Sequence, residues 1–340
     1  MKVLHVIDRL ETGGAEKLFV SITKLLTARG IETGALLFTA GSALDKELEK
    51  RLQLHVLNRR GKYNLLTLYK AHKICSGYDI VHTHLRHVYA YIRLAQWLFG
   101  GKYKLVVHDH AAIIKDIPKR YAGMFKPAYY IGVNKEQIAW AVSTIGVHKE
   151  HIFLLENTVM PVTGDENKTD NPKDLMVVAN IRAVKNIEFA VALAKRINFT
   201  LDIYGNIIER DYYKRLLQDI DNDTIRMIHD VSDMTPMYGQ YKMAIHCSPA
   251  ETGPLVLIEY LAAGLPFIAY KTGSAAEAIA EELPQLFMNN FEYEDWGKRI
   301  EDILLDHSLP DKMKTLYKKK FNPEDYTNKC LDIYRKIYSS

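Results

Sequence analysis

Short apolar runs alternate along the chain with longer stretches that carry helical apolar spacing. In the first half, the runs predict seven strands, at residues 3–7, 33–38, 54–57, 80–84, 105–108, 130–133 and 152–155. Helical spacing lies between them, most clearly at 15–29, 65–76 and 88–99. Because strands that alternate with helices form parallel sheets, this half predicts a doubly wound α/β domain.

The pattern stops in the middle of the chain and then restarts. A polar stretch with proline and glycine, NTVMPVTGDENKTDNPK, predicts a linker. Beyond it, strands are expected at 175–181, 200–204, 225–228, 243–247 and 267–270, and a last amphipathic helix at 325–338. We therefore predict an N-terminal domain over 1–158, a linker over 159–173, a C-terminal domain over 174–322 and a final helical segment over 323–340.

Composition narrows the class of protein. The length of 340 residues suits two domains, and 48% hydrophobic with 25% charged residues is typical of a soluble globular chain. Three widely spaced cysteines, Cys75, Cys247 and Cys330, favour a reducing compartment over disulfides or a zinc site. No run approaches the ~20 apolar residues that span a bilayer. The first residues, MKVLHVIDRL, predict a strand rather than a signal peptide, so a cytoplasmic location is expected.

Charge is divided unevenly between the two halves. Residues 1–160 hold 23 Lys+Arg and 13 Asp+Glu, a balance of +10, whereas residues 161–340 hold 22 and 28, a balance of −6. A basic half attracts anionic surfaces such as lipid headgroups, and scattered solvated lysines explain the balance equally well. Peripheral contact with an anionic membrane at its inner face therefore stays open, and no nucleic-acid partner is predicted.

The most informative segment is SPAETGPLVLIEYLAAGLPFIAY at 248–270. Glu251 is expected in the loop at the carboxyl end of a strand, and Glu259 about one and a half turns into the next helix. Pro254 suits the first helical turn, and Gly264 ends the helix. A helix N-terminus binds a diphosphate and carboxylates accept hydrogen bonds from vicinal hydroxyls, which together suit a sugar nucleotide. Taken without the residues around them, the two carboxylates would instead be interpreted as solvated glutamates on an ordinary βα unit.

The residues around the pair, E-T-G-P-L-V-L-I-E-Y-L-A-A-G-L-P-F-I-A, resemble the E-x7-E signature of the retaining glycosyltransferases of family 4. The resemblance implies a GT-B fold, with two Rossmann-like domains facing a central cleft and the last helix returning to the N-terminal domain. It implies metal-independent transfer of a sugar, with retention, from a nucleoside diphosphate sugar, UDP being favoured. The acceptor would be a hydroxyl of a glycan or a lipid-linked molecule, and no cofactor is expected. The donor-binding residues that it implies are Glu251, Thr252, Gly253, Pro254, Leu255 and Glu259, with Glu251 also catalytic.

Two glycines follow the first predicted strand, in DRLETGGAE at 8–16. Glycine allows the backbone to approach a ligand closely. The resemblance implies that Gly13 and Gly14 face the donor diphosphate or the acceptor. Without the resemblance, the same residues would indicate only a tight turn between strand and helix.

A pair of cations follows the first strand of the second half, in VVANIRAVKN. Cations there can clamp a diphosphate leaving group. Many family members carry G-R-L-x-x-x-K-N, but here Asn180 holds the arginine position and Arg182 lies three residues before Lys185. Of the two, Lys185 matches the family pattern more closely, and the resemblance implies that it is a catalytic and donor-binding cation. For both residues, the alternative is an ordinary surface charge at the start of a helix. The resemblance also implies that Gly205, in DIYGN, and Val231, in HDVSDM, contact the nucleotide through their backbone.

Histidines gather in VHTHLRH at 81–87 and in VVHDHAA at 106–112. His82 and His84 alternate along a predicted strand, and we expect them to point to opposite faces. No carboxylate or cysteine ligands accompany them, so no metal site is predicted. The resemblance implies that His110, and less firmly His84, reach the acceptor or the transferred sugar, with His110 catalytic. His82 is interpreted as a packed core histidine.

Basic and apolar residues also mix in AIIKDIPKRYAGMFKPAYY at 112–130. Such a segment can lie in a membrane interface near a lipid-linked acceptor, or it can line the acceptor cleft, and both stay open.

These observations predict a retaining glycosyltransferase of cell-surface polysaccharide or glycoconjugate biosynthesis. Two other classes of function stay open. An accessory subunit with the same fold would agree with the displaced Arg182 and with Asn157-Thr158 in place of a frequent Asn-Gly. A sugar-nucleotide epimerase would require acid and base residues at the sugar ring, which the sequence does not single out. Donor-dependent glycosyl transfer separates the three.

Overall fold

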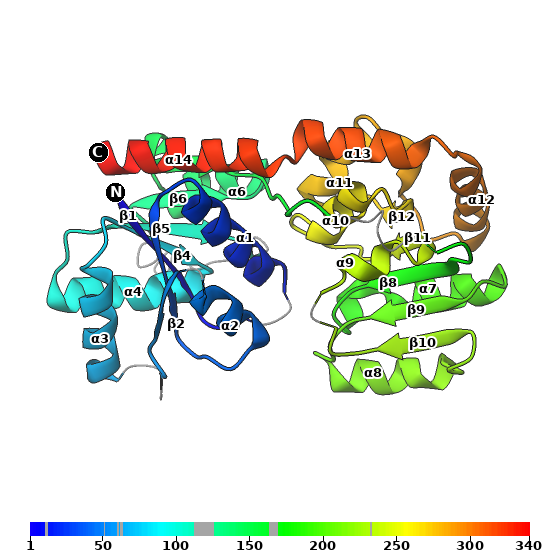
Figure 1. Cartoon of the computed structure of the whole chain (residues 1–340), viewed down its shortest axis with the longest axis horizontal. Coiled ribbons are helices and arrows are strands. Elements are labelled where there is room, and N and C mark those ends of the chain that lie inside the picture. The colour runs from blue at the N-terminus through cyan, green and yellow to red at the C-terminus, as the bar shows by residue number, and fades with distance from the viewer. Residues whose placement is uncertain are drawn as a thin grey trace. The chain divides into compact units, whose positions relative to one another are not determined.

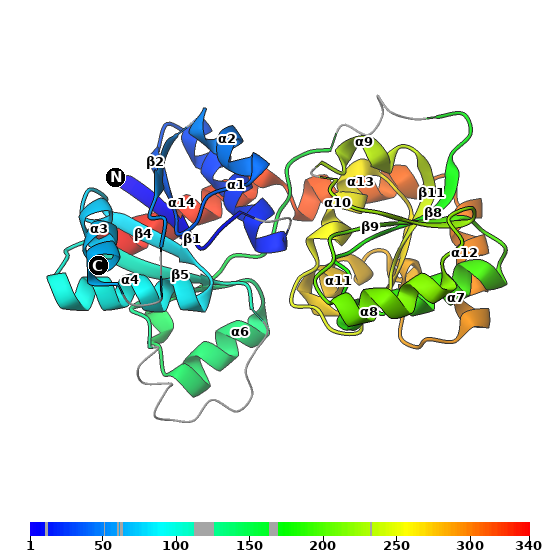
Figure 2. The ribbon, with the colours of Figure 1, turned by 90° about the horizontal axis from the view of Figure 1, so that it is seen from below.

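The computed structural model describes residues 1–340 except 11–12, 51, 60, 62–63, 112–125, 163–168 and 232. The chain divides into two compact units. Unit 1 is Met1–Asn157 together with Pro323–Ser340, and unit 2 is Thr158–Asn322. Within each unit, helices cover both faces of a parallel sheet (Figures 1 and 2). The prediction of two doubly wound α/β halves is thus confirmed.

Unit 1 contains a seven-stranded sheet in the order β3-β2-β1-β4-β5-β6-β7, with every pair parallel. Its strands are β1 Lys2–Ile7, β2 Glu32–Leu37, β3 Gln53–Val56, β4 Ile80–His84, β5 Lys104–Asp109, β6 Tyr129–Gly132 and β7 Ile152–Leu154. Its helices are α1 Gly14–Ala28, α2 Ala43–Glu49, α3 Leu65–Cys75, α4 Arg86–Phe99, α6 Lys135–Trp140 and α14 Pro323–Ser339, with short turns η1 Ala141–Ile145 and η2 Lys149–His151.

Unit 2 contains a six-stranded parallel sheet in the order β10-β9-β8-β11-β12-β13. Its strands are β8 Lys173–Val178, β9 Leu201–Tyr204, β10 Ile225–Ile228, β11 Tyr241–His246, β12 Phe267–Tyr270 and β13 Phe287–Met288. Its helices are α7 Ile187–Arg196, α8 Arg210–Leu216, α9 Thr235–Tyr238, α10 Leu255–Ala263, α11 Gly273–Ala280, α12 Tyr293–Leu305 and α13 Leu309–Lys320. The short turns are η4 Ala183–Lys185, η5 Leu217–Asp219 and η6 Pro284–Leu286.

The central strands are buried on both faces, as expected where helices pack on each side of a parallel sheet. Every residue of β4 is buried, and so is every residue of β9. Strand order and helix direction together place the loops that leave the carboxyl ends of the strands at one edge of each sheet. The candidate site residues lie in those loops, at the ends of the strands that precede them and in the first turns of the helices that follow. In the described part of the chain, no helix combines the length and the apolar character that a membrane crossing requires.

Candidate active site

The strand order of unit 2 reverses between β8 and β11, and the segments that leave these two strands meet there. Lys185 ends the turn η4 after β8, and Glu251 lies in the loop after β11. Lys185 Nζ donates to Glu251 Oε1, and both side chains are largely buried. In open α/β sheets, ligands bind in the crevice at such a reversal. The structure thus brings together two predicted site residues that lie 66 positions apart in the sequence.

Glu251 is held in its ionised form. Burial would raise the pKa of this carboxyl, but His246 and Lys185 together outweigh burial and lower the pKa to about 2. His246 Nε2 lies 3.5 Å from Glu251 Oε1. His246 is the last residue of β11 and is buried. The sequence analysis did not single it out, because one histidine at the end of an apolar strand carries no motif of its own.

The start of α11 holds the loop that carries Glu251. Glu251 N donates to Thr272 Oγ1 at 3.2 Å. Ser274 donates to Thr252 O twice, from its backbone N at 3.0 Å and from Oγ at 3.2 Å. Gly273 has φ +81°, and a Cβ there would lie 3.1 Å from Glu251 O. The backbone angle strains any other residue at 273, and the close approach adds to the preference for glycine.

Glu259 lies in the second turn of α10, and its side chain is buried. Tyr238, the last residue of α9, donates its hydroxyl to Glu259 Oε2 at 2.5 Å. Burial, followed by the charge of Glu259, raises the pKa of Tyr238 well above its usual value, so this hydroxyl remains a donor. Helix α10 begins at Leu255 without a side-chain cap, and Pro254 precedes it rather than lying in its first turn as predicted.

Arg182 and Lys185 turn to different partners. Arg182 Nε lies 3.7 Å from Glu209 Oε1, and the Arg182 side chain is about half exposed, at 49%. Asn186, which follows Lys185, has φ 49° and ψ 46°, a left-handed conformation that asparagine tolerates. This residue joins η4 to α7 and so sets the direction in which the chain leaves Lys185. Contact of Arg182 with a diphosphate stays a prediction.

Two further predicted donor residues follow β9 and β10. A Cβ on Gly205 would lie 1.9 Å from Ala179 O, so backbone packing alone requires glycine there. His229 Nδ1 donates to Gly205 O at 2.6 Å and joins the two loops. Asp230 has φ 61° immediately before Val231. Contact of Gly205 and Val231 with a nucleotide stays a prediction.

In unit 1, the strand order reverses between β1 and β4, and the predicted residues follow these strands and the neighbouring β5. Gly13 caps α1 and Gly14 is its first residue, as the sequence predicted. His84 ends β4, and His110 follows β5. His84 Nδ1 lies 3.2 Å from His110 Nε2, and the two rings are stacked with an interplanar angle of 6°. The structure therefore brings these two predicted histidines together.

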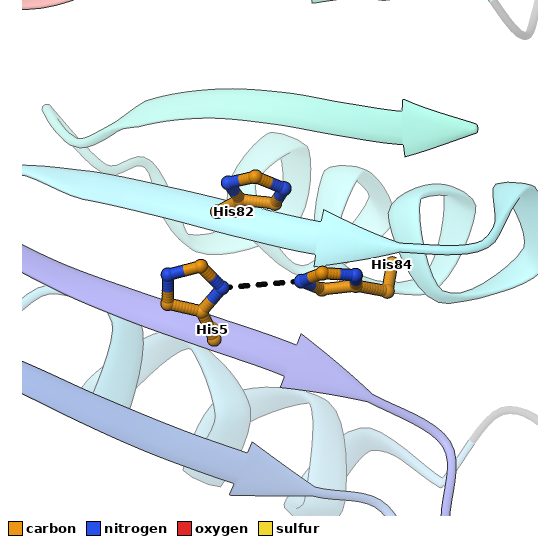
Figure 3. A group of neighbouring side chains, drawn as sticks. All are labelled: His5, His82 and His84. Atoms are coloured by element: carbon orange, nitrogen blue, oxygen red, sulfur yellow. Dashed lines mark hydrogen bonds between the residues drawn. The ribbon is translucent and has the colours of Figure 1, made fainter. Parts of the chain in front are cut away.

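His82 and His84 point to the same face of the sheet, so the prediction of opposite faces is wrong. Residues two apart on a strand share a face, and these two rings stack with centroids 4.6 Å apart. Figure 3 shows both rings beside His5 of β1, whose Nδ1 lies 3.1 Å from His84 Nε2. His82 is fully buried, as the interpretation of a core histidine requires.

Five imidazoles and one phenol form a continuous hydrogen-bonded chain across unit 1. Tyr334 of α14 lies 2.6 Å from His82 Nδ1 and 3.2 Å from His5 Nε2. The other nitrogen of His82 lies 3.1 Å from His108 Nδ1. The members follow the order His108, His82, Tyr334, His5, His84 and His110. Burial lowers the pKa of every ring, to about 3 for His5 and about 4 for His110, so all five are neutral at pH 7.

Neutral imidazoles are also metal ligands. Ligand atoms of His84, His108 and His110 lie within 4.8 Å of one another, as do those of His5, His82 and His84. Almost all of these nitrogens already serve the hydrogen-bonded chain, and only His108 Nε2 has no partner among the described atoms. A metal ion would have to replace those hydrogen bonds, so the arrangement favours the hydrogen-bonded form. The absence of a metal site stays a prediction.

Asp109 anchors the loop that carries His110. Its carboxylate is fully buried. Arg86 Nε and the Tyr130 hydroxyl each donate to Asp109 Oδ2 at 2.7 Å. Ala111 N donates to Asp109 Oδ1 at 3.1 Å. The sequence analysis passed over Asp109 because the histidines on either side of it carried the motif.

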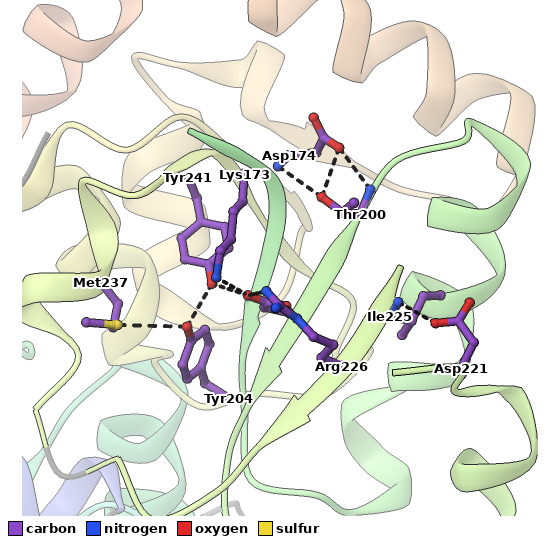
Figure 4. Close-up of polar contacts among 10 residues, drawn as sticks. Lys173, Asp174, Thr200, Tyr204, Asp221, Ile225, Arg226, Met237 and Tyr241 are labelled. Atoms are coloured by element: carbon purple, nitrogen blue, oxygen red, sulfur yellow. Dashed lines mark hydrogen bonds and ion pairs between the residues drawn. The ribbon is translucent and has the colours of Figure 1, made fainter. Parts of the chain in front are cut away.

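Another buried carboxylate, Asp202 of β9, belongs to the framework of unit 2. Figure 4 shows its partners Arg226, Lys173 and Tyr241 gathered around it. Arg226 of β10 donates to it twice, with both N–O distances at 2.7 Å. Lys173 of β8 donates at 3.0 Å, and the Tyr241 hydroxyl of β11 donates at 2.5 Å. Tyr204 extends the network to Tyr241 at 2.7 Å. Asp202 lies in the amino-terminal half of its strand, so this cluster joins four neighbouring strands away from the ligand-binding edge.

The basic and apolar segment at 112–130 lies mostly outside the described residues, which resume at 126. Neither interpretation of it is tested.

Two family models match the chain. Residues 12–159 match Glycosyltransferase Family 4, and residues 163–320 match Glycosyl transferases group 1. With its two doubly wound units, the chain is a GT-B glycosyltransferase. Within that class, the chain resembles glycosyltransferase family 4, as the residues around Glu251 and Glu259 predicted.

Relatives and solved structures agree with this assignment. The chain is 25% identical over 324 residues to the lipopolysaccharide core biosynthesis glycosyltransferase LpsE of Rhizobium meliloti, covering 91% of this chain and 90% of that protein. The crystal structure of HepE from Anabaena in complex with UDP and glucose matches with a TM-score of 0.83 and 17% identity, covering 98% and 99% of the two chains. A glycosyltransferase structure from Rickettsia africae matches with a TM-score of 0.77 and 19% identity, covering 99% and 98%.

Proposed function

We propose that the protein transfers a sugar, with retention, from a UDP-sugar to a hydroxyl of a glycan or lipid-linked acceptor in cell-surface glycan synthesis. One observation carries this proposal: Lys185, Glu251 and the uncapped start of α10 meet where the sheet of unit 2 reverses. The solved complexes of HepE with UDP and with UDP-glucose support the choice of donor. The name of LpsE supports the choice of acceptor class.

Lys185 and the N-terminus of α10 would hold the donor diphosphate without a metal or another cofactor. The helix start offers N–H donors and the positive end of its dipole. Thr252 to Leu255 form the loop and first turn beside them. Glu259 would accept hydrogen bonds from the ribose hydroxyls, and Gly205 and Val231 would meet the nucleotide through their backbone.

Glu251 would orient the sugar and stabilise positive charge that develops at the anomeric carbon. Its pKa of about 2 keeps it charged at neutral pH, which this role requires. The bond from the anomeric carbon to the phosphate oxygen breaks, and the nucleotide leaves with the electron pair. The acceptor oxygen then attacks from the same face and gives its proton to the departing phosphate. No protein general base is assigned, because the leaving group can take that proton.

Unit 1 would bind the acceptor through Gly13 and the histidine pair His84 and His110, and Gly14 would face the donor diphosphate. Neutral imidazoles suit this task because each offers one donor and one acceptor to sugar hydroxyls. Asp109, Arg86 and Tyr130 would act only by positioning the loop of His110.

A panel of nucleotide sugars tested by thermal shift would identify the donor. A ligand that binds only the folded state raises the apparent stability by RT ln(1 + [L]/Kd). We expect one UDP-sugar to stabilise the wild type, with the shift reduced in Glu259→Gln and kept in Glu301→Gln, an exposed glutamate of α12. A GDP-sugar as the only stabilising ligand would replace UDP in the proposal.

Turnover separates the alternative functions. Release of UDP that depends on an added acceptor supports glycosyl transfer. Donor binding without release of UDP would favour an accessory subunit, and conversion of the donor without an acceptor would favour an epimerase. A protein that no nucleotide sugar stabilises would contradict the donor site itself.

A further inference from the structure

Helices α3 and α4 of unit 1 carry an unusual number of exposed apolar side chains. Of the fifteen large hydrophobic residues that are exposed in the described chain, six lie on these two helices. They are Leu65, Leu66 and Tyr69 of α3 and Trp97, Leu98 and Phe99 of α4, which together we name the α3–α4 surface. Trp97 is 76% exposed and Leu66 is 79% exposed. Exposed apolar groups that gather in this way usually mark an interaction site.

The two helices form one packed pair. They lie against each other in both views of unit 1 (Figures 1 and 2). The rings of Tyr69 and Phe99 meet edge to face with centroids 5.3 Å apart. The Tyr91 hydroxyl lies 3.1 Å from Thr67 Oγ1 and joins the middle of α4 to the start of α3. The surface therefore spans two helices that pack against each other.

The charged residues of helices α3 and α4 are all basic. Neither helix contains an aspartate or glutamate, and residues 64–104 hold six Lys+Arg against one acidic residue, Asp79. Asp79 Oδ2 already accepts from Lys2 N at 2.7 Å. Lys73 and Arg93 are exposed. Arg93 lies one helical turn before Trp97, so a cation and an aromatic ring share one side of α4.

We propose that the α3–α4 surface docks on an anionic membrane surface. Tryptophan and leucine enter the headgroup region of a bilayer, where the indole N–H stays hydrated. Lysine and arginine beside them attract anionic headgroups, and the two effects add. A second copy of this surface fits poorly because it would bring like charges together. The proposal does not depend on the donor site of unit 2, and it differs from the contact predicted at 112–130.

Vesicle sedimentation of the full chain tests the proposal. We expect the wild type to sediment with vesicles of phosphatidylcholine and phosphatidylglycerol, and to stay in solution with phosphatidylcholine alone or at high salt. Trp97→Ala/Leu66→Ala and Lys73→Glu/Arg93→Glu should each lower the bound fraction by about tenfold or more, as expected when apolar insertion and charge both contribute. Matched controls in unit 2 are Leu305→Ala, 74% exposed, and Lys318→Glu, also exposed; both should bind like the wild type.

Tryptophan fluorescence gives a second readout, which does not require the two double variants to fold. Trp97 is the exposed tryptophan, whereas Trp140 and Trp296 are buried. Anionic vesicles should shift the emission of the wild type to shorter wavelength, and Trp97→Phe should remove that shift. Sedimentation that is unaffected by both double variants would overturn the proposal. So would a change of oligomeric state in those variants without vesicle binding, because it would make the surface a protein interface.

Discussion

Units 1 and 2 share one architecture but differ in the ionisable groups that they bury where their sheets reverse. In unit 1, five largely buried imidazoles contact one another, and a buried carboxylate beside them, Asp109, pairs with Arg86. In unit 2, two largely buried glutamates each have a donor of their own, and the buried base His246 lies beside one of them. Glu251 has Lys185, and Glu259 has Tyr238.

The difference shows two ways of burying an ionisable side chain. A base without a counter-ion is buried by losing its charge, so its pKa falls. An acid with a close cation is buried with its charge, so its pKa also falls, although burial alone would raise it. The first arrangement gives neutral hydrogen-bonding groups that suit hydroxyls. The second gives a fixed negative charge that suits a developing cation.

Acidification should produce the largest difference between the two units, which is a difference in their stability. In the unfolded chain, histidines titrate near 6.5, whereas burial lowers the pKa of His5, His82, His84 and His108 far below that value. Below pH 6.5 the unfolded chain therefore binds protons that folded unit 1 does not, and stability falls as the pH falls. Between pH 7 and pH 5, the loss is about 2 kcal/mol for each of these four histidines. Glu251, with a pKa of about 2, stays charged throughout this range.

Urea unfolding at pH 7 and pH 5 would measure this difference. Trp140 reports on unit 1 in the variant Trp97→Phe/Trp296→Phe, and Trp296 reports on unit 2 in Trp97→Phe/Trp140→Phe. We expect the midpoint for unit 1 to fall sharply and that for unit 2 to change little. Equal losses in the two units would contradict the assignment of neutral buried histidines.

Removal of the cation in unit 2 should be the next largest effect. Lys185→Ala takes away the charge proposed to stabilise the leaving diphosphate, and kcat should fall at least about 100-fold, or about 3 kcal/mol in the barrier. Lys195→Ala is the matched control, because Lys195 lies on α7 and pairs with the exposed Asp219. Glycosyl transfer assays of the two variants make the comparison. A kcat for Lys185→Ala close to that of the control would remove Lys185 from the mechanism.

Breaking the histidine chain should destabilise unit 1 by a smaller amount. Tyr334→Phe removes the hydroxyl between His82 and His5 and leaves two buried ring nitrogens without that partner. We expect a loss of about 1–3 kcal/mol in the free energy of unfolding. Tyr338→Phe, in the same helix and 55% exposed, should change it little. Urea unfolding at pH 7 tests both, and equal values would show that the Tyr334 contacts add nothing to stability.

Arg182→Ala should have the smallest effect. Arg182 is half exposed, and its pairing with Glu209 at 3.7 Å is of a kind that contributes about 0–1 kcal/mol. We expect kcat to change by less than about tenfold, the factor to which 1.4 kcal/mol corresponds. The same transfer assay applies. A loss as large as that of Lys185→Ala would mean that Arg182 turns to the diphosphate when the donor binds.

Sequence periodicity was sufficient for the fold because each apolar run became a strand within a few residues of its predicted bounds. The partners of the site residues could not be predicted in this way. His246, Tyr238 and Tyr334 reach their partners only through the tertiary fold, and single histidines and tyrosines form no motif. Local backbone geometry was equally hidden: Leu85, just after His84, has φ +77°, a conformation unfavourable for leucine. The facing of His82 and His84 was predicted wrongly, although the two-residue period of a strand settles it.

The hydrogen-bonded chain that begins at His108 and ends at His110 has a direction, because each of its hydrogen bonds has a donor and an acceptor. A neutral imidazole has one N–H and one lone pair, so each ring donates to one neighbour and accepts from the other. When the Tyr334 hydroxyl donates to one of its two ring neighbours and accepts from the other, the direction continues through it, and the proton positions of the five rings form one variable with two values. One value leaves His108 Nε2 with a proton and no acceptor, whereas the other leaves it with only a lone pair, which is the lesser penalty by analogy with buried backbone groups. That second sense makes His110 Nε2 an acceptor from His84 and assigns the His110 proton to Nδ1.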